Sequence, residues 1–381
     1  MSIYLDNAAT SYPKPESVYQ AVLHAMREIG ASPGRGGYRR SLEAGRILFQ
    51  ARETAAAFFS VPDSSRIIFT HSATEALNMA LRGTLVAGDH VITSSMEHNS
   101  LARPLRLLEK QGVTLTIVQT GPDGIIDPDD VRRVLTPRTR MIAIGHVSNV
   151  SGTIQPIDLV SAIAREAGVL FLLDAAQSAG SVPINVVSSA IDLLAVPGHK
   201  GLYGPQGSGL LYVASPVVLT PLLAGGTGTS STSEDQPDTM PDGFEAGTHN
   251  LPGIAGLKAG LEFVMEQGVA VIGEHERSLV SYAIERLYGL PQVTLHCPSD
   301  PAVRGAVLSF TIAGKDSAAV AFELDQRFDI AVRAGLHCAP RAHRTLGTFP
   351  GGTVRMSPGW FTTREDIAMF CDAVVQCLKN D

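Results

Sequence analysis

Two short motifs, 26 residues apart, carry side chains that together could perform covalent chemistry on an amine. The apolar run VLFLLD ends in Asp174, followed by Gln177, and the run IDLLAV is followed by PGHKG, which contains His199 and Lys200. Pyridoxal 5′-phosphate (PLP) chemistry requires a lysine that bonds to the cofactor's aldehyde and an aspartate that pairs with its protonated ring nitrogen. Separately, a strand-end aspartate often caps a helix and most lysines are solvated. Together the two motifs predict a PLP site, in which Gln177 could donate to the ring's phenolate oxygen.

Other polar side chains also follow apolar runs. Ala73 and Thr74 open an expected helix after IIFTHS, His98 follows HVITSSME, and Asn149 follows MIAIGHVS. The free N–H groups at a helix start suit a phosphate, an imidazole could stack on the PLP ring, and an amide could reach its phenolic oxygen. Each residue also has a simpler explanation, as a helix cap, a core or surface histidine, or a turn asparagine.

One cysteine differs from the rest in its neighbourhood. Cys338 lies in VRAGLHCAPRAH, where Arg333, His337, Arg341 and His343 could supply the positive charge that favours a thiolate. The other cysteines, Cys297, Cys371 and Cys377, are typical of small buried hydrophobic residues. No pair has zinc-type spacing, and four cysteines are too few to staple 381 residues. Cys338 is therefore the candidate nucleophile.

Arg355 lies within TVRMS, a run that predicts a strand. An arginine inside an apolar strand is costly unless its charge is paired. A structural salt bridge satisfies that requirement, and so does a bidentate grip on the carboxylate of an amino acid.

The elements that must position these side chains alternate between strand and helix from about Arg66 to Val213. The expected strands are RIIF, HVIT, VTLTIV, MIAIGHV, VLFLLD, IDLLAV and SGLLYV. This alternation predicts an α/β fold with a mainly parallel sheet, and such sheets bind ligands beyond the carboxyl ends of their strands. The candidate residues follow those ends. The segment from Leu223 to Thr248 is rich in Gly, Ser, Thr, Asp and Pro and predicts a long loop.

A second, shorter alternation predicts a smaller C-terminal α/β lobe. It comprises VTLHC, GAVLSFTI, IAVRAG and TVRMS, and it ends in a helix near Arg364 to Lys379. We expect an N-terminal arm at 1–15, a large cofactor-binding domain at 16–250, and connecting helices plus the small domain with the cysteine loop at 251–381. The arm and the first helices should pack against the small lobe, with the active site in the cleft between the lobes.

Composition narrows the classes of function. The net charge is −7, and Lys and Arg are scattered rather than gathered into runs, so nucleic acid is a poor candidate partner. No apolar run approaches the roughly 20 residues of a membrane span, and the N-terminus lacks a signal pattern. These features predict a cytoplasmic protein without a membrane partner.

An ordered set of motifs then makes the prediction specific. YLDNAAT, TEALN, EHNS, SNVSGT, DAAQ, GHK, FEAGT, RAGLHCAP and VRMS run in this order along almost the whole chain. The set resembles the cysteine desulfurase and selenocysteine lyase family, which are PLP enzymes of the aminotransferase class V type. The resemblance implies PLP-dependent transferase fold type I, with a mostly parallel seven-stranded sheet in the large domain and a smaller C-terminal α/β domain. It also implies a homodimer.

The resemblance assigns roles position by position. The implied catalytic residues are Lys200, which binds PLP covalently, Cys338 and the stacking residue His98. The implied cofactor contacts are Ala73, Thr74, Asn149, Asp174, Gln177, His199 and, from the second subunit, Thr248. The implied substrate contacts are Asn7 and Arg355, and no metal is implied. Two departures concern the phosphate contacts: Pro197 stands where many relatives have serine, and Gly201 is an extra residue after Lys200.

The implied reaction converts L-cysteine to L-alanine, with Lys200 moving protons and Cys338 taking the sulfur as a persulfide that passes to an acceptor protein or reductant. The short stretch from Cys338 to Arg355 resembles a subgroup that includes selenocysteine lyases, so L-selenocysteine is an alternative substrate. A small-amino-acid transaminase and a kynureninase-like hydrolase are further alternatives, which Cys338 disfavours. A non-catalytic scaffold would have no need for the full set of residues.

Overall fold

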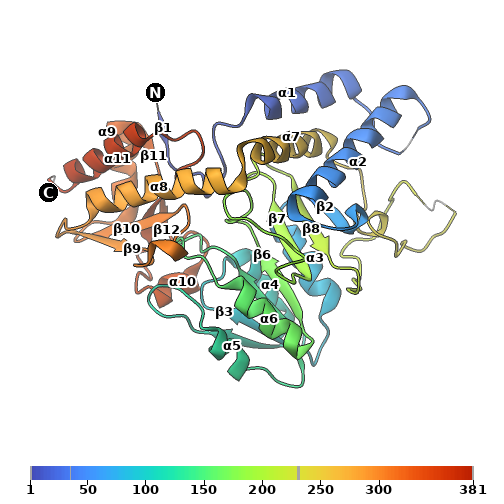
Figure 1. Ribbon diagram of the computed structural model, residues 1–381, viewed down its shortest axis with the longest axis horizontal. Helices are drawn as coiled ribbons and strands as arrows, with labels where there is room; N and C mark the ends of the chain where they lie inside the picture. Colours follow the sequence, from blue (N-terminus) through green and yellow to red (C-terminus); the bar gives the residue numbers. More distant parts are fainter. Residues whose placement is uncertain (1, 35, 230–231, 380–381) are drawn as a thin grey trace.

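The computed structural model describes residues 2–34, 36–229 and 232–379, which form two lobes of unequal size (Figure 1). The larger lobe contains a seven-stranded sheet in the order β2-β8-β7-β6-β5-β3-β4, in which β8 is antiparallel to its neighbours and the other pairings are parallel. Its strands are β2 (Ile67–Thr70), β3 (His90–Ser94), β4 (Thr114–Val118), β5 (Thr139–Gly145), β6 (Leu170–Asp174), β7 (Leu193–Pro197) and β8 (Gly209–Val213). The predicted α/β class and mostly parallel sheet are confirmed, and each of the seven apolar runs forms a strand.

Helices cover both faces of this sheet (Figure 1). They are α2 (Arg39–Phe59), α3 (Ala73–Thr84), α4 (Asn99–Glu109), α5 (Pro128–Arg133), α6 (Ile157–Ala167) and α7 (Leu251–Gln267). Successive strand residues point to opposite faces. In β6, Phe171 and Leu173 are buried with residues of α2, α5, α6 and α7, whereas Leu172 is buried with residues of α3 and α4. Because both faces are covered, the strands are apolar throughout rather than alternating.

The smaller lobe contains a four-stranded antiparallel sheet in the order β12-β13-β10-β9. Its strands are β9 (Val293–His296), β10 (Leu308–Ile312), β12 (Arg333–Gly335) and β13 (Thr353–Met356), and its helices are α8 (Val269–Leu287), α9 (Ser317–Phe328), α10 (Pro340–Thr345) and α11 (Arg364–Cys377). Buried residues of α8, α9 and α11 form one core with the sheet, and the rings of Phe310 and Phe370 meet edge to face within it.

The N-terminal arm joins the small lobe through a separate two-stranded sheet. In that sheet β1 (Ile3–Tyr4) pairs in parallel with β11 (Ile330–Ala331), so the predicted strand IAVRAG is divided between β11 and β12. The expectation that the arm packs against the small lobe is correct. The same expectation is wrong for the first helices, because α1 (Glu16–His24) and α2 pack against α7 on the large lobe. The apolar residues of α7 lie in the core of the large sheet, which makes it the available partner.

The predicted long loop from Leu223 to Thr248 contains one short 3-10 turn, Asp242–Phe244, in its described part. A buried ion pair fixes its end: Glu245 accepts hydrogen bonds from both terminal nitrogens of Arg52, at 2.7 and 2.8 Å, and is 2.8 Å from His249 Nε2. Burial alone would raise the pKa of Glu245, but the hydrogen bond with His249 and the charge of Arg52 hold it below its ordinary value. Within the described residues, no helix is long and apolar enough to span a membrane.

Candidate active site

One cavity lies beyond the carboxyl ends of the parallel strands, where a sheet of this topology binds ligands. Eight of the predicted site residues line it together: Ala73, Thr74, His98, Asn149, Asp174, Gln177, His199 and Lys200. They come from the segments that follow β2, β3, β5, β6 and β7. Local sequence pattern places each residue just past a strand end, and the parallel sheet brings those ends to one edge.

Lys200 is positioned by two chain segments that approach very closely. A Cβ atom added to Gly180 would lie 2.0 Å from the carbonyl oxygen of Gly201, and one added to Gly201 would lie 2.3 Å from that of Ala179. Both positions therefore require glycine. The contact packs the lysine loop against the turn that follows Asp174.

The environment of Lys200 favours the neutral amine. Burial lowers its pKa from 10.5 to about 8; Asp174 opposes this shift, while Arg355 and Arg333 add to it. A neutral amine is the form that attacks an aldehyde and that removes a proton from carbon. The lowered pKa makes this neutral form easier to reach than for an ordinary lysine.

Asp174 ends β6 and is buried at the same edge. Its Oδ1 accepts a hydrogen bond of 2.9 Å from the backbone N–H of Ala176. Burial raises the pKa of Asp174, whereas that hydrogen bond and the charge of Lys200 lower it. A cationic ring nitrogen would satisfy the remaining acceptor capacity of this carboxylate.

His98 caps α4 and has a defined tautomer. Its Nδ1 accepts a hydrogen bond of 3.1 Å from the N–H of Ser100, so the neutral ring carries its proton on Nε2. Burial and the charge of Lys200 lower the pKa of His98 to about 4. Ser100 Oγ lies 2.8 Å from Thr74 Oγ1, which links α4 to the start of α3. A neutral imidazole beside Lys200 is suited to stacking on an aromatic ring.

The residues present fit PLP. Ala73 and Thr74 begin the 12-residue helix α3, whose first-turn N–H groups have no intrahelical acceptors and favour a phosphate. The buried Nδ1 of His199 has no hydrogen-bond partner among the described residues and offers another contact. At the ring end the cavity supplies a carboxylate, Asp174, and an amine, Lys200. Pro197 also lines the cavity.

The N-terminal arm closes one side of the site. Gln177 Nε2 donates to the carbonyl of Ala8 at 3.0 Å, and the carbonyl of His199 accepts from the N–H of Ser11 at 3.0 Å and from Lys14 Nζ at 3.3 Å. Asn7 lines a second cavity that shares Lys200 and Gln177 with the first. The amide of Gln177 therefore already donates one hydrogen bond to the arm, which leaves its second N–H for a bound ring.

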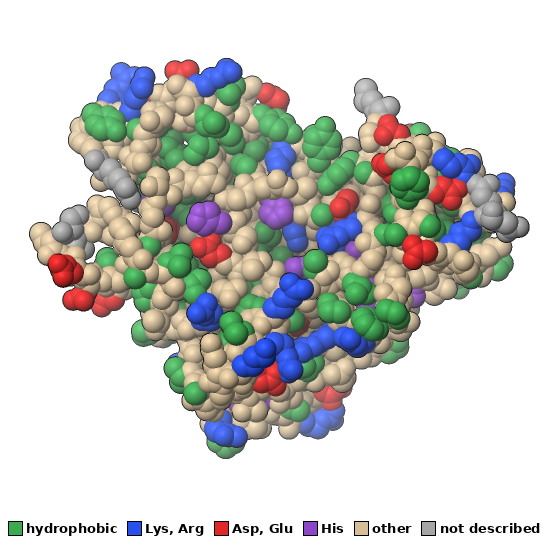
Figure 2. Space-filling view, turned by 180° about the vertical axis from the view of Figure 1, so that it is seen from behind, with side chains coloured by type: hydrophobic (Ala, Val, Ile, Leu, Met, Phe, Trp, Pro, Cys, Tyr) green, Lys and Arg blue, Asp and Glu red, His purple; other side chains and the backbone are tan. Residues whose placement is uncertain are grey.

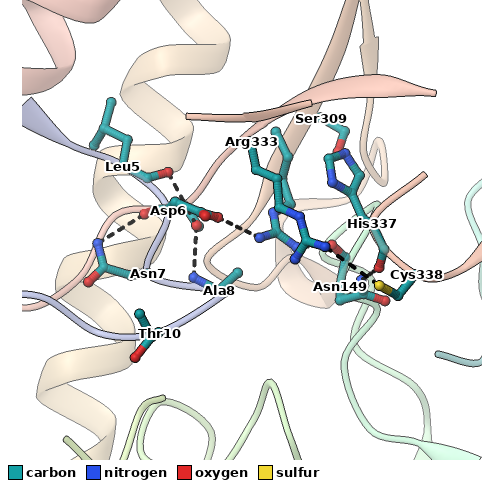
Figure 3. A network of polar contacts seen from close by, with 12 residues as sticks. Leu5, Asp6, Asn7, Ala8, Thr10, Asn149, Ser309, Arg333, His337 and Cys338 are labelled. Carbon is teal, nitrogen blue, oxygen red and sulfur yellow. Dashed lines mark hydrogen bonds and ion pairs between the residues drawn. The ribbon is translucent and has the colours of Figure 1, made fainter. Parts of the chain in front are cut away.

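The loop with Cys338 is held against the cavity wall (Figure 3). Asn149 Nδ2 donates to the carbonyl of His337 at 2.6 Å, and the N–H of Asn99 donates to the carbonyl of Cys338 at 2.7 Å. These bonds support left-handed backbone at both His337 and Cys338, with φ of 46° and 59°. The exposed Cys338 Sγ lies 3.5 Å from Arg333 Nη2.

Arg355 forms the structural ion pair that the sequence left open. Its Nη2 donates to Asp6 Oδ1 at 2.6 Å and its Nη1 donates to the carbonyl of Asn149 at 3.1 Å, while its side chain is only 1% exposed. Both terminal nitrogens are engaged. A substrate carboxylate would therefore have to share this guanidinium with Asp6, a residue that sequence reasoning had not singled out.

Thr248 does not lie in the cavity with Lys200. It is exposed and lines a separate cavity with His71, Glu75 and Glu245. Its contact with a phosphate in a second subunit, which the resemblance implies, stays a prediction.

Sequence reasoning also missed Glu97, which lines the cavity beside His98 and is 3% exposed. Its Oε1 shares a hydrogen bond of 2.5 Å with Ser94 Oγ, and its Oε2 accepts one of 2.9 Å from the N–H of Gly145. Burial raises its pKa from 4.5 to about 8. Glu97 therefore joins the ends of β3 and β5 as a neutral acid near pH 7. The signal in the sequence that could have found Glu97 was an acidic residue close behind a predicted strand.

We expect Glu97→Gln to be more stable than the parent protein at high pH. Glutamine reproduces the protonated acid, with its carbonyl toward the Gly145 N–H and its amide toward Ser94 Oγ. The raised pKa means that this group's contribution to wild-type stability is complete below about pH 4.5 and is lost as pH rises through about 8. Thermal unfolding at a series of pH values should show the difference growing to roughly 5 kcal/mol.

The exposed Glu266 supplies the control. Glu266→Gln removes one exposed carboxylate and so controls for the change in net charge. A pH-independent difference for Glu97→Gln would show that folding leaves the pKa of Glu97 unchanged.

Comparison with known proteins agrees with this geometry. The family described as aminotransferase class-V matches residues 3–370. A probable cysteine desulfurase of Methanothermobacter thermautotrophicus is 35% identical over 96% of this chain and 92% of its own length. A cysteine desulfurase of Salmonella agona is 36% identical over 96% of this chain and 90% of its own.

Solved structures are similar over nearly the whole fold. The apo cysteine desulfurase of Thermococcus onnurineus superposes with a TM-score of 0.92 at 33% identity, covering 99% of this chain and 95% of that one. The cysteine desulfurase CsdA of Escherichia coli, in an S-sulfonic acid form, gives a TM-score of 0.90 at 30% identity with the same coverage.

Proposed function

The chain belongs to the aminotransferase class-V family, and on that premise we propose that it is a PLP-dependent cysteine desulfurase that leaves L-alanine and holds the sulfur as a persulfide on Cys338. The observation that carries the proposal is that the groups suited to PLP lie next to a loop with an exposed cysteine. Lys200, Asp174 and His98 line one cavity, and the wall of that cavity holds the loop of an exposed cysteine beside an arginine.

Each part of the cavity would hold one part of the cofactor. Lys200 would bind it covalently, Asp174 would face the ring nitrogen, and the imidazole of His98 would lie against the ring. Thr74, Ala73 and His199 would bind the phosphate. When bound, PLP supplies an electron sink that makes the bonds around the substrate α-carbon labile.

The chain's own groups perform the remaining steps. Lys200 Nζ removes the proton from the substrate α-carbon as a general base and later returns a proton as a general acid. The thiolate of Cys338 attacks the substrate sulfur, so that a sulfur–sulfur bond forms while the bond from sulfur to the β-carbon breaks. Arg333 Nη2 lies 3.5 Å from the sulfur that makes this attack. The three-carbon fragment leaves as L-alanine.

We also propose that the active enzyme is a homodimer. Thr248 would complete the phosphate site of the other subunit, because in its own subunit it lies outside the cavity of Lys200. An apolar groove along α1, lined by Tyr19, Leu23 and Met26 among others, offers a surface for such association. All three of these side chains are exposed in the single chain.

Alanine formation tests the proposal. The PLP-loaded protein should convert L-cysteine to alanine in the presence of dithiothreitol, with one sulfide released for each alanine. Alanine from L-selenocysteine alone would identify a selenocysteine lyase. Alanine from neither substrate would leave only the fold and the family.

A further inference from the structure

A band of positive charge crosses a molecule whose net charge is −7 (Figure 2). On α4 the side chains of Arg103 and Arg106 are exposed, and on α10 that of Arg344 is exposed while that of Arg341 is half-buried. Arg341 lies within electrostatic range of Arg106 and Arg344, and the N–H of Asn99 on α4 donates to the carbonyl of Cys338, two residues before α10. We call these four arginines the basic face.

The basic face is incompletely neutralised within the chain. Glu109 pairs with Arg106, and Arg344 stacks 4.1 Å from the ring centre of Phe349. The buried Nη1 of Arg341 has no hydrogen-bond partner among the described residues. Among the described residues, Glu109 is the one carboxylate that forms an ion pair with any of these four arginines, so the face keeps an excess of positive charge.

The basic face begins at the cysteine loop. The N–H of Asn99, the first residue of α4, donates to the carbonyl of Cys338. Arg103 and Arg106 follow Asn99 at positions i+4 and i+7, so they continue along the same side of the helix. Arg341 comes three residues after Cys338, and Thr345 Oγ1 anchors α10 to Ser95 Oγ at 3.0 Å.

We propose that the basic face docks an acidic acceptor protein and presents the acceptor's thiol to Cys338. This inference rests on the proposed function, since it requires a persulfide on Cys338. The acceptor thiolate attacks the outer sulfur, a new sulfur–sulfur bond forms on the acceptor, and the Cys338 thiolate leaves. No further oxidant or reductant is needed. Charge complementarity accelerates such encounters.

A protein suits this face better than a nucleic acid. The step requires a thiolate, which nucleic acids lack. Four arginines on two short helix faces are also a small area for tracking a phosphate backbone, which takes an extended positive groove.

The test uses short peptides with one central cysteine, flanked by glutamates, glutamines or lysines. The full-length holoenzyme is loaded with ³⁵S-cysteine, and transfer of label to each peptide is timed. The glutamate peptide should accept sulfur about tenfold faster than the glutamine peptide at low ionic strength, and the lysine peptide should be slowest. High salt should remove the advantage.

Paired charge reversals locate the effect. Arg103→Glu with Arg344→Glu should abolish the preference for the glutamate peptide. Arg138→Glu with Arg140→Glu changes the net charge equally at the opposite end of β5 and should retain it. All three proteins should form alanine equally fast with dithiothreitol, which shows that the variants fold.

Each other result overturns the proposal. Equal rates for the three peptides, or equal loss of preference in both double variants, would mean that the face does not select an acceptor. An RNA oligonucleotide that bound the face and displaced the glutamate peptide would assign it to nucleic acid. Failure of the proposed function is distinct, because then no alanine forms even with dithiothreitol.

Discussion

Replacing Lys200 with alanine is expected to leave a folded protein that cannot hold PLP covalently and that has lost at least about 100-fold of its alanine production. The variant lacks both the amine that bonds to the cofactor and the general base at the substrate α-carbon. Borohydride reduction followed by peptide mapping measures the first loss directly, because the parent protein should retain the cofactor on the peptide that contains Lys200. Thermal unfolding of the apo proteins checks that the fold survives.

Two further variants sharpen this expectation. Lys200→Arg keeps a positive charge, but its guanidinium stays protonated and cannot bond to an aldehyde, so it should also lose covalent PLP. Lys258→Ala removes a lysine of α7 that pairs with Glu262. It should change neither the covalent retention of PLP nor the rate of alanine formation. Cofactor retained on any peptide of Lys200→Ala at the parental level would refute the assignment.

Replacing Cys338 with alanine should separate the two halves of the chemistry. We expect the variant to bind PLP like the parent protein, because Cys338 does not line the cavity of Lys200. Alanine formation from L-cysteine should fall by about 100-fold or more, since a positioned thiolate is replaced by reductant attacking from solution. Single-turnover assays without reductant should show one labelled sulfur on the parent protein and none on the variant.

Cys297 provides the matched control for Cys338. It is half-buried, and burial raises the pKa of its thiol. Cys297→Ala should therefore load and transfer sulfur like the parent protein. If Cys338→Ala forms alanine from L-cysteine at the parental rate, the persulfide belongs elsewhere or does not form. If that variant loses the reaction with L-cysteine but keeps the one with L-selenocysteine, the thiol serves sulfur alone.

Several details of the fold depended on more than local pattern. The run IAVRAG has the composition of one strand, yet Ile330 and Ala331 pair with the N-terminal arm while Arg333 to Gly335 pair with β13. Backbone hydrogen bonds to two different partners divide the run. The first helices have apolar faces that would suit either lobe, and the position of α7 decided between them.

The sequence by itself determined the strands of the large sheet and the residues that follow their carboxyl ends. Apolar runs of strand length and the glycines near Lys200 are local features, and a parallel sheet must bring such ends to one edge. For that reason Asp174, His98 and Lys200 were predicted together.

Only the tertiary structure decided how distant charges pair. Asp6 meets Arg355, Asn149 holds the carbonyl of His337, and Glu97 is buried against the N–H of Gly145. These contacts join segments as much as 349 residues apart. They depend on strand register and on the packing of one lobe against the other, which the periodicity of a short segment does not encode. A charged group buried in this way needs an oppositely charged or hydrogen-bonding partner, or it must become neutral. Which of these happens depends on the groups that the folded chain places beside it.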